Sequence, residues 1–464
     1  MSTSRRDFVK GAAWTTGVAA GPAIRPAWGQ SSPNDRVNVA VIGFHGRGQS
    51  HYQSLARLPN VRVAYLCDID ERLFPDAVAA VERIGGNKPA TEYDFRRLLD
   101  KKDIDAVSIA TPDHWHALQT IWACQAGKDV YVEKPVSYSV VEGRRMVEAA
   151  RKYNRIVQAG LNMRSEGPLQ SAIRFVQSGQ FGTVYRAKSV VYRGRASIGR
   201  AAESPIPKGV HWDLFLGPAP YRPFTLNRFH YGWHYFWDTT TTEVGCNGVH
   251  VMDAVRWGLG KKVHPVKIHC AGGRYLDDSD QDTPNVQNAS FEYADGMLVE
   301  LEVTTLFSPP FGGVQMIGSF FYTSKGYVCG VGLSGSRWST VLTEFTPANK
   351  PDLPSGVSQR AFNASFPEIA YKPGPAVPGQ EKEEKGAHFR NFIDCVRSRK
   401  REELYCEIEE GHMSTALCHL ANISYRTGRK LVFDPATEKF PGDKEANAYL
   451  TRQYRAPYVL PERV

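Results

Sequence analysis

Three features that would define other classes of protein are missing from this sequence. The 464 residues include eight cysteines but no Cys-x-x-Cys pair, so these cysteines do not form a metal-site spacing and need not form disulfides. The formal charge of +9 comes without a dense run of Lys or Arg, which gives no indication of nucleic-acid binding. Residues 11–24 are weakly apolar, but the stretch is too short and too rich in Gly and Ala to span a membrane. We therefore expect a globular protein that binds neither nucleic acid nor a membrane.

The first thirty residues have the order of an export signal. Arg5 and Arg6 come before the weakly apolar stretch, and the small-residue site Ala27-Trp28-Gly29 follows it. This order resembles a twin-arginine signal, and a disordered basic tail is the alternative. We expect residues 1–29 to be removed and the folded mature chain to reach a bacterial periplasm. No cysteine precedes Cys67, so we expect no lipid anchor at the cleavage site.

A strand, a glycine turn and a helix come next. Residues 37–42 are rich in β-branched side chains, Gly43-Phe44-His45-Gly46-Arg47-Gly48 follows, and residues 51–58 have helical spacing. Such a turn lets the backbone approach a pyrophosphate and directs helix N-terminal N–H groups toward it. His45 takes the place of the second glycine in the G-x-G-x-x-G pattern, and we expect Gly46 to relieve the crowding.

An acidic residue follows the second predicted strand, which covers residues 61–66. Asp68 lies 20 residues after Gly48. An acid at this spacing accepts hydrogen bonds from the adenosine ribose and repels a 2′-phosphate, so it favours NAD over NADP as the cofactor. The alternative is that Asp68 and Asp70 only form a turn.

The next two predicted strands end in polar motifs. Residues 105–110 lead into Thr111-Pro112-Asp113-His114-Trp115-His116, and residues 129–132 lead into Glu133-Lys134-Pro135. Ligands bind outside the carboxyl ends of strands in open α/β sheets, so we place the chemistry at Lys134. Burial would help this lysine to lose and regain a proton; the alternative is a surface Glu-Lys pair. We expect no metal at His114 and His116, because no acidic partner has a suitable spacing.

The alternation of strands and helices predicts a parallel sheet with right-handed connections. A helix over 140–153 and a short strand over 155–159 complete it before Asn162. We therefore predict an α/β protein with an N-terminal Rossmann dinucleotide-binding domain over residues 30–164.

Taken together and in this order, the glycine turn, Asp68, the Thr-Pro-Asp-His-Trp-His motif and Glu-Lys-Pro resemble the glucose-fructose oxidoreductase and inositol dehydrogenase (Gfo/Idh/MocA) family. The resemblance implies that Lys134 lies beside the nicotinamide and the reacting hydroxyl. The motifs assign cofactor binding to Gly43, Phe44, His45, Gly46, Arg47, Gly48, Asp68, Thr111, Pro112, His114, His116, Glu133, Lys134 and Asn162.

Residues 165–440 predict a second, α+β domain with an open, largely antiparallel sheet. Its expected strands cover residues 183–193, 286–293, 297–305, 314–322, 338–345 and 430–433, and its expected helices cover 168–179, 388–397 and 409–427. We expect residues 350–386 to form a surface loop and the tail, residues 441–464, to wrap a neighbour. In the family such a sheet commonly makes oligomer contacts, which implies a homo-oligomer.

Further catalytic candidates lie between residues 231 and 257. The aromatic run over 231–238 suits stacking on sugar faces, although aromatic clusters are also typical of a core. His250 and Asp253 are one helical turn apart. Many family members carry an Asp four residues before this His, where Cys246 stands here; some exported relatives carry an acid seven residues before it, which is Glu243. Asp253 could instead orient His250, and Glu243 could be a loop charge.

These patterns predict an exported oxidoreductase that holds NAD tightly and oxidises a sugar-like secondary alcohol, with Lys134, His250, Glu243 and Asp253 as catalytic candidates. An alternative within the family is a redox-neutral glycoside hydrolase that oxidises, eliminates and reduces on one NAD. A third hypothesis is a non-catalytic binder, against which the intact Lys134 argues. The sequence does not determine the sugar, the hydroxyl or the number of subunits.

Overall fold

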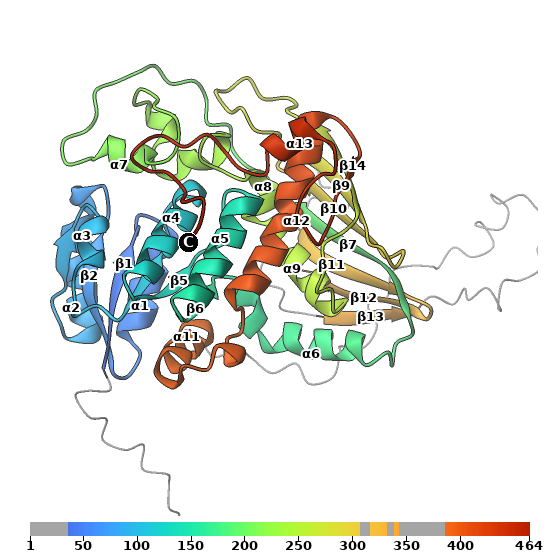
Figure 1. Cartoon of the computed structure of the whole chain (residues 1–464), viewed down its shortest axis with the longest axis horizontal. Helices are drawn as coiled ribbons and strands as arrows, with labels where there is room; N and C mark the ends of the chain where they lie inside the picture. The colour runs from blue at the N-terminus through green and yellow to red at the C-terminus, as the bar shows by residue number, and fades with distance from the viewer. Residues whose placement is uncertain (1–35, 307–315, 332–337, 343–385) are drawn as a thin grey trace, which may run out of the picture. The chain divides into compact units, whose positions relative to one another are not determined.

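The computed structural model describes residues 36–306, 316–331, 338–342 and 386–464 (Figure 1). The predicted export signal and almost all of the predicted loop over 350–386 lie outside these ranges. Within them, no helix is both long enough and apolar enough to cross a membrane. Residues 37–464 cluster as a single unit, so the predicted domain boundaries at 164 and 440 stay predictions.

The N-terminal half is a parallel sheet of six strands in the order β3-β2-β1-β4-β5-β6. The strands and helices of this half are β1 (Val37–Ile42), α1 (Arg47–Ala56), β2 (Val61–Cys67), α2 (Phe74–Gly85), β3 (Ala90–Glu92), α3 (Arg96–Leu99), β4 (Ala106–Ile109), α4 (Asp113–Gln125), β5 (Asp129–Val132), α5 (Val140–Lys152) and β6 (Val157–Ala159). This order confirms the predicted Rossmann fold. The central strands β4 and β5 are buried at every residue, as expected of a parallel sheet covered on both faces.

The predicted first helix begins too late in the sequence. The structure starts α1 at Arg47, directly after Gly46, whereas the apolar spacing placed it at residue 51. The spacing of apolar residues does not reveal a first helical turn that faces a cavity, because that turn packs no apolar side chains into the core.

The second half is built on a sheet of eight strands in the order β13-β12-β11-β7-β10-β9-β8-β14. Its elements are α6 (Gly167–Gln177), β7 (Val184–Tyr192), α7 (Trp212–Leu216), α8 (Thr242–Cys246), α9 (Gly248–Gly258), β8 (Lys267–Gly273), β9 (Val286–Glu292), β10 (Leu298–Thr304), β11 (Met316–Thr323), β12 (Gly326–Val331), β13 (Trp338–Leu342), α11 (Ala387–Ser398), α12 (Ile408–Thr427), β14 (Leu431–Val432) and α13 (Lys444–Ala448). The strands pair in antiparallel fashion except for β7 with β10, which confirms the predicted mixed sheet. The strands β8 and β12 were not predicted.

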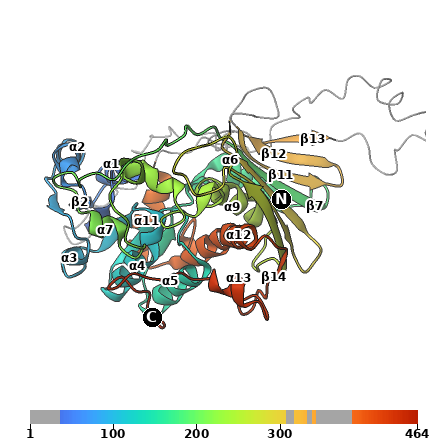
Figure 2. The same cartoon turned by 90° about the horizontal axis from the view of Figure 1, so that it is seen from above.

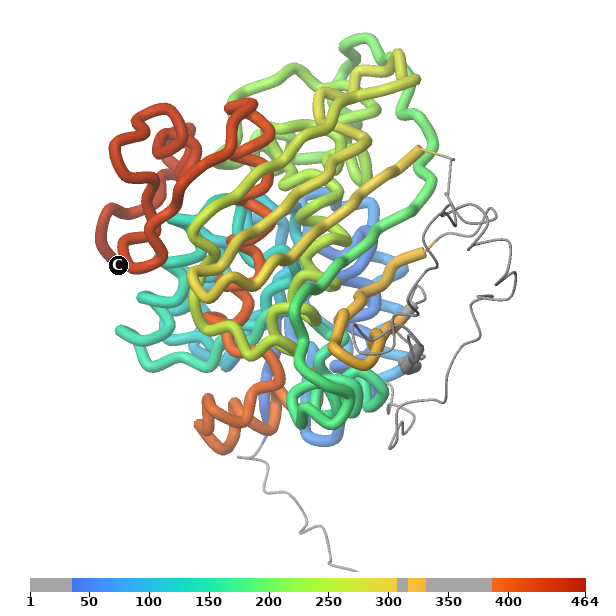
Figure 3. Tube along the Cα trace, turned by 90° about the vertical axis from the view of Figure 1, so that its right-hand side faces the viewer, coloured from blue at the N-terminus to red at the C-terminus, as the bar shows by residue number. Residues whose placement is uncertain are grey.

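Helices α9 and α12 pack on one face of this sheet and join it to the Rossmann half. Helix α9 contacts β7 and β11, and α12 contacts both β8 and α5. The other face is the one seen in Figure 3, where no helix of the described ranges covers it. Helix α11 returns to the N-terminal half, where Phe389 stacks on Tyr131 of β5 with 4.5 Å between ring centroids.

A buried ion-pair network holds α9 to its neighbours. Asp253 on α9 accepts hydrogen bonds from Arg164 Nε at 2.8 Å and Arg164 Nη2 at 2.7 Å, and from the Ser414 hydroxyl of α12 at 2.6 Å. The side chains of Arg164 and Asp253 are 5% and 1% exposed. Burial would raise the pKa of Asp253, but the charge of Arg164 holds it below its ordinary value.

We predict that Asp253→Asn destabilises the protein by about 3 kcal/mol in chemical unfolding, because it removes the buried charge that accepts two hydrogen bonds from Arg164 and leaves that guanidinium only Glu410, at 3.1 Å, as an acidic partner. The matched control is Asp295→Asn, which removes the exposed partner of Lys261 and should cost about 1 kcal/mol or less. The stabilisation from ionised Asp253 is lost in acid, so the difference from wild type should narrow as the pH falls below the ordinary pKa of 3.8. Equal losses in the two variants would contradict a structural role for Asp253.

Candidate functional site

A cavity of about 290 Å³ lies between the carboxyl ends of the Rossmann strands and segments of the second half. Most residues predicted to bind the cofactor line it: Gly43, Phe44, His45, Gly46, Arg47, Asp68, Thr111, Pro112, His116, Glu133 and Lys134. Gly48, His114 and Asn162 are not among its walls. The residues facing these from the second half include Arg193, Arg195, Phe215, Phe229, His230, Tyr231, Trp233, His234, Cys246 and Asn247.

The glycine turn can hold a pyrophosphate because its glycines play two different parts. Gly43 and Gly48 pack against neighbouring backbone, and Gly46 faces open space. Gly43 has φ of +79°, and a Cβ there would lie 2.9 Å from the Ala110 carbonyl oxygen. A Cβ on Gly48 would lie 1.9 Å from the Gly43 oxygen, whereas one on Gly46 would meet nothing within 4 Å. Gly48 therefore acts through packing, and Gly46 leaves the space that a phosphate needs. The ring of His45 lies against His230, with 3.6 Å between centroids.

Asp68 has the turn-forming role that the sequence offered as an alternative, and its ribose-binding role stays a prediction. Its Oδ2 accepts a hydrogen bond from the Phe44 N–H at 2.7 Å, and its Oδ1 accepts one from the Asp70 N–H at 3.1 Å. Burial raises the pKa of this carboxyl to about 6. The carboxylate thus shapes the glycine turn, and each oxygen keeps a lone pair for a ribose hydroxyl.

Glu133 joins the end of β5 to the start of α1. Its Oε1 accepts a hydrogen bond from Arg47 Nε at 2.9 Å and lies 3.0 Å from His51 Nε2. Its Oε2 accepts one from the Lys134 N–H at 3.2 Å. Burial alone would raise the pKa of Glu133, but Arg47 and His51 hold it well below its ordinary value. A permanently ionised carboxylate therefore fixes both the glycine turn and the backbone of Lys134.

Lys134 lies in the cavity with its charge retained. Its Nζ donates a hydrogen bond to the Cys246 carbonyl oxygen at 2.8 Å and lies 3.9 Å from Cys246 Sγ. Burial would lower the pKa of Lys134, but the neighbouring acidic groups Cys246, Glu133 and Asp113 raise it above its ordinary value. The expectation that burial eases proton loss was therefore wrong: nearby negative charges outweigh desolvation.

The other catalytic candidates are placed differently from Lys134. His250, Glu243 and Asp253 do not line the cavity. Burial and the charge of Lys134 lower the pKa of His250 to about 3, so its ring is neutral, and its buried Nδ1 has no hydrogen-bond partner. Asp253 is engaged by Arg164 and Ser414, and this arrangement gives no support to a catalytic role.

Glu243 supports residues that do line the cavity. Its Oε2 accepts a hydrogen bond from Arg195 Nη2 at 2.9 Å, and its Oε1 accepts one from the Asn247 side chain. The side chains of Arg195 and Glu243 are 11% and 9% exposed, so this is no loose loop charge. No local sequence pattern pointed to Arg195, which follows the end of β7 and lines the cavity.

Asp113 is a site residue that the motifs contained but did not single out. It is 1% exposed and lines the cavity. Its Oδ2 accepts hydrogen bonds from the N–H and the hydroxyl of Thr241 at 3.0 and 2.8 Å, whereas its buried Oδ1 has no partner. Burial raises its pKa. Its position between Pro112 and His114, within the motif, was the sequence feature that could have identified Asp113 as a site residue.

The aromatic run divides between the cavity and the core. Tyr231, Trp233 and His234 line the cavity, and the His234 ring stacks on Trp233 with 3.6 Å between centroids. Phe236 is 1% exposed, and Trp237 lines a different cavity. The core hypothesis thus describes Phe236, whereas the sugar platform stays a prediction for the residues that line the first cavity.

Curated relatives match this chain over only part of their length. A "Glycosyl hydrolase family 109 protein" of Shewanella pealeana is 30% identical over 176 residues, which are 37% of this chain and 38% of the relative. One of Saccharopolyspora erythraea is 32% identical over 181 residues, 37% of this chain and 39% of the relative. The uncharacterized oxidoreductase YrbE of Bacillus subtilis is 30% identical over 156 residues, 33% and 43% of the two chains. The matched stretches therefore span less than half of these relatives.

Solved structures share the fold across both halves. The WlbA dehydrogenase of Bordetella pertussis, in complex with NADH and UDP-GlcNAcA, aligns with a TM-score of 0.61 at 18% identity, over 86% of this chain and 99% of that one. A levoglucosan dehydrogenase in complex with NADH and L-sorbose has a TM-score of 0.61 at 16% identity, over 86% and 98%. The aldose-aldose oxidoreductase of Caulobacter crescentus has 0.58 at 17% identity, over 86% and 100%.

Family models cover most of the chain. The model described as "Oxidoreductase family, NAD-binding Rossmann fold" matches residues 37–161, in agreement with the predicted NAD cofactor. The model described as "Oxidoreductase family, C-terminal alpha/beta domain" matches residues 165–305 and 352–460. The chain belongs to the Gfo/Idh/MocA oxidoreductase family.

Proposed function

We propose that this protein oxidises a secondary alcohol of a sugar-like substrate with an NAD that stays bound. One observation carries the proposal: the Lys134 ammonium group lies in the same cavity as the glycine turn and Asp68. The cavity thus presents a dinucleotide cradle at one end and a charged hydrogen-bond donor with aromatic rings at the other.

Bound NAD would supply the hydride acceptor, and the residues of the chain would hold the substrate and move its proton. Lys134 donates a hydrogen bond to the reacting oxygen, and it gives up a proton to that oxygen in the reductive direction. In the oxidative direction the neutral form of Lys134 accepts the hydroxyl proton. The raised pKa of Lys134 makes its neutral form scarce at neutral pH. A positive charge held beside Lys134 would lower that pKa and make the neutral form more common.

A sugar-like substrate is supported by the site and by the similar structures. Tyr231 and Trp233 place aromatic side chains in the cavity wall, and aromatic rings pack well on the apolar faces of sugars. The named structural neighbours were solved with UDP-GlcNAcA and with L-sorbose. Which sugar and which hydroxyl react is a question for substrate screening.

Redox-neutral glycoside hydrolysis is the second candidate. It is favoured by the curated relatives, which are named as family 109 glycosyl hydrolases. Within the family this reaction uses one NAD, on which the sugar is oxidised transiently and reduced again.

The proposal includes export by the twin-arginine route to the periplasm, which rests on Arg5, Arg6 and the stretch that follows them. A periplasmic enzyme has no pool of free NAD, so a protein exported in folded form must carry its own. Each turnover must then return the cofactor to its starting state. We also propose a homo-oligomer formed through the face of the eight-stranded sheet that is seen in Figure 3.

We predict that Lys134→Met lowers turnover by about 10²–10⁴-fold while leaving bound cofactor and fold intact, because it removes the acid–base group. The control is the exposed Lys325→Met, which should behave as wild type. In wild type, kcat/KM for oxidation should rise with pH as Lys134 loses its proton, because the neutral lysine is the reactive form. The Lys134→Met profile should be flat in this range, and near-normal activity in that variant would remove Lys134 from the mechanism.

We predict that the purified mature protein releases NAD, and not NADP, on denaturation, and that added NAD does not raise its rate. Mass spectrometry identifies the released cofactor. A protein that purifies empty and needs dissolved NAD in every turnover would contradict the proposal.

Heavy water separates the two candidate reactions. Hydrolysis of a glycoside should yield free sugar with deuterium at the carbon beside the transient ketone. A dehydrogenase should instead yield a keto-sugar or lactone in an amount equal to the bound cofactor, until a second hydride acceptor is added.

A further inference from the structure

The segment over residues 199–235, here called the strap, crosses from the second half to the Rossmann half. It contains α7 (Trp212–Leu216) and two short helices, η4 (Leu226–Arg228) and η5 (His230–Tyr235). In Figures 1 and 2 the strap lies along the edge of the molecule beside α3 and α4. Leu214, Phe215, Phe229 and His230 of the strap line the cavity opposite the glycine turn.

The strap pairs with the backbone just beyond Asp68. Asp70 and Val210 form an antiparallel bridge. The Glu71 N–H donates to the Gly209 oxygen at 2.9 Å, and the His211 N–H donates to the Ile69 oxygen at 2.8 Å. Because Asp68 marks the ribose position, this pairing closes the cavity on the adenosine side.

Stacked rings reinforce the backbone pairing at two points. The His211 ring lies 3.9 Å from the Tyr93 ring, with an interplanar angle of 9°, and its Nε2 is 2.7 Å from Glu71 Oε1. The His230 ring lies 3.6 Å from the His45 ring, and its Nε2 is 3.1 Å from Asp70 Oδ2. The second contact therefore joins the strap directly to the glycine turn.

The strap has its own core and is not a loose loop. Six of its buried apolar side chains pack together as one cluster: Val210, Trp212, Phe215, Leu216, Phe224 and Phe229. Trp115 of α4 donates to the Leu214 oxygen at 2.9 Å, and a Cβ on Gly217 would lie only 2.1 Å from the Trp115 ring. The strap thus docks against the Rossmann half through close packing.

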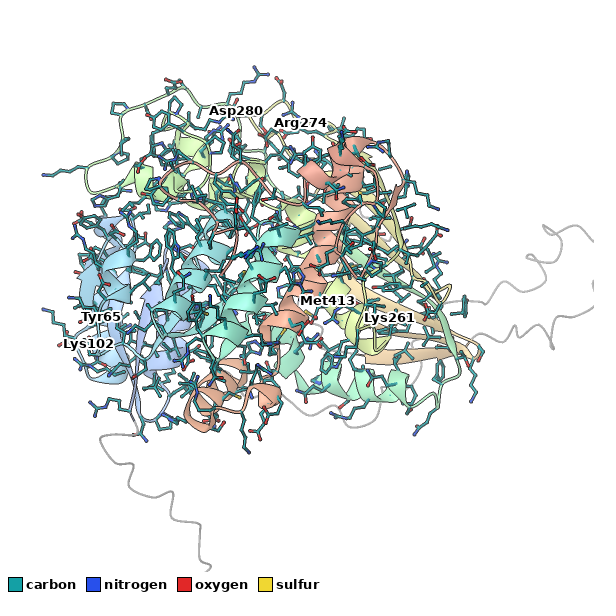
Figure 4. The ribbon with its side chains drawn as sticks, in the orientation of Figure 1. Tyr65, Lys102, Lys261, Arg274, Asp280 and Met413 are labelled. Carbon is teal, nitrogen blue, oxygen red and sulfur yellow. The ribbon has the colours of Figure 1, made fainter. Side chains whose placement is uncertain are left out.

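The far side of the strap is anchored as well. Asp280, labelled in Figure 4, accepts hydrogen bonds from the Ala201 N–H at 2.9 Å and from the Asn227 side chain at 2.8 Å. In the C-terminal tail, Arg455 Nε donates to the Gly217 oxygen at 2.8 Å. The tail that was expected to wrap a neighbour thus braces this chain's own strap.

His230 has a left-handed backbone conformation, which its surroundings must hold in place. Its φ is +49°, in the left-handed region that side chains other than glycine avoid. Such residues persist where the surrounding structure holds them, and they gather at ligand clamps. The contacts to His45 and Asp70 supply that constraint.

We infer that the strap is a cofactor-retaining part of the site, in which His45 and His230 form a clasp over the dinucleotide cavity beside Asp68. The cofactor leaves only when the clasp and the backbone pairing at Asp70 separate. His45, which stands where the glycine pattern has its second glycine, makes this stacking contact. The inference rests on the proposed function and extends it, because it names the residues that keep NAD bound between turnovers.

The test measures cofactor release from the purified protein. The variants are His230→Ala and His45→Gly, and the second restores the glycine that the pattern lacks. His269→Ala, at an exposed position on β8, is the matched control. Bound NADH is displaced with excess NAD, its fluorescence decay gives the release rate, and mass spectrometry gives the NAD content after dialysis.

We predict that each clasp variant releases NADH about three- to tenfold faster than wild type, because stacking of an aromatic pair contributes a factor of this size. Each variant should also keep less NAD after dialysis and become dependent on added NAD, whereas the control should match wild type. A thermal unfolding midpoint close to that of wild type shows that the fold is kept.

The experiment distinguishes a failure of the clasp from a failure of the proposed function. Wild-type release rates in a folded His45→Gly protein would overturn the clasp while leaving the proposed function in place. A wild-type protein that itself purifies empty would overturn the tightly bound cofactor and with it the proposed function.

Discussion

The rest of the site depends on the hydrogen bonds and the ion pair that the buried carboxylate of Glu133 makes with Arg47, His51 and the Lys134 N–H. Removing an ion of this size from water costs several kcal/mol, and only a well-placed set of donors offsets that cost. Arg47, His51 and the Lys134 N–H provide those donors. Since Arg47 begins α1 and Glu133 follows β5, one carboxylate fixes the glycine turn relative to the lysine that we propose as the acid–base group.

The charged groups around Lys134 favour the protonated form of its amine over the neutral form. Burial favours the neutral amine, but Cys246, Glu133 and Asp113 act in the opposite direction and raise the pKa of Lys134. A charged lysine suits a group that must hold and orient an oxygen before it moves a proton. The neutral ring of His250, whose pKa falls to about 3, then adds no competing positive charge in the same region.

The Thr-Pro-Asp-His-Trp-His segment serves the contact between the two halves as much as the cofactor. Asp113 holds Thr241, Trp115 holds the strap at Leu214, and His114 Nε2 lies 2.9 Å from the Phe215 oxygen. His114 was assigned to the cofactor from the motif alone, and the structure places it in this contact. The same motif therefore both lines the cavity and holds segments of the second half against it.

The sequence by itself determined the Rossmann half, the mixed sheet and the position of Lys134, because these depend on local patterns. A β-branched run predicts a buried strand, a glycine turn leaves backbone space, and a strand end places its next residue at the ligand edge. Only the tertiary structure decided which polar residues meet. Arg195 with Glu243, Arg164 with Asp253, and His45 with His230 are brought together from distant segments, and no local spacing records such pairs. The direction of the Lys134 pKa was decided in the same way, because it depends on the charges that folding gathers around the amine.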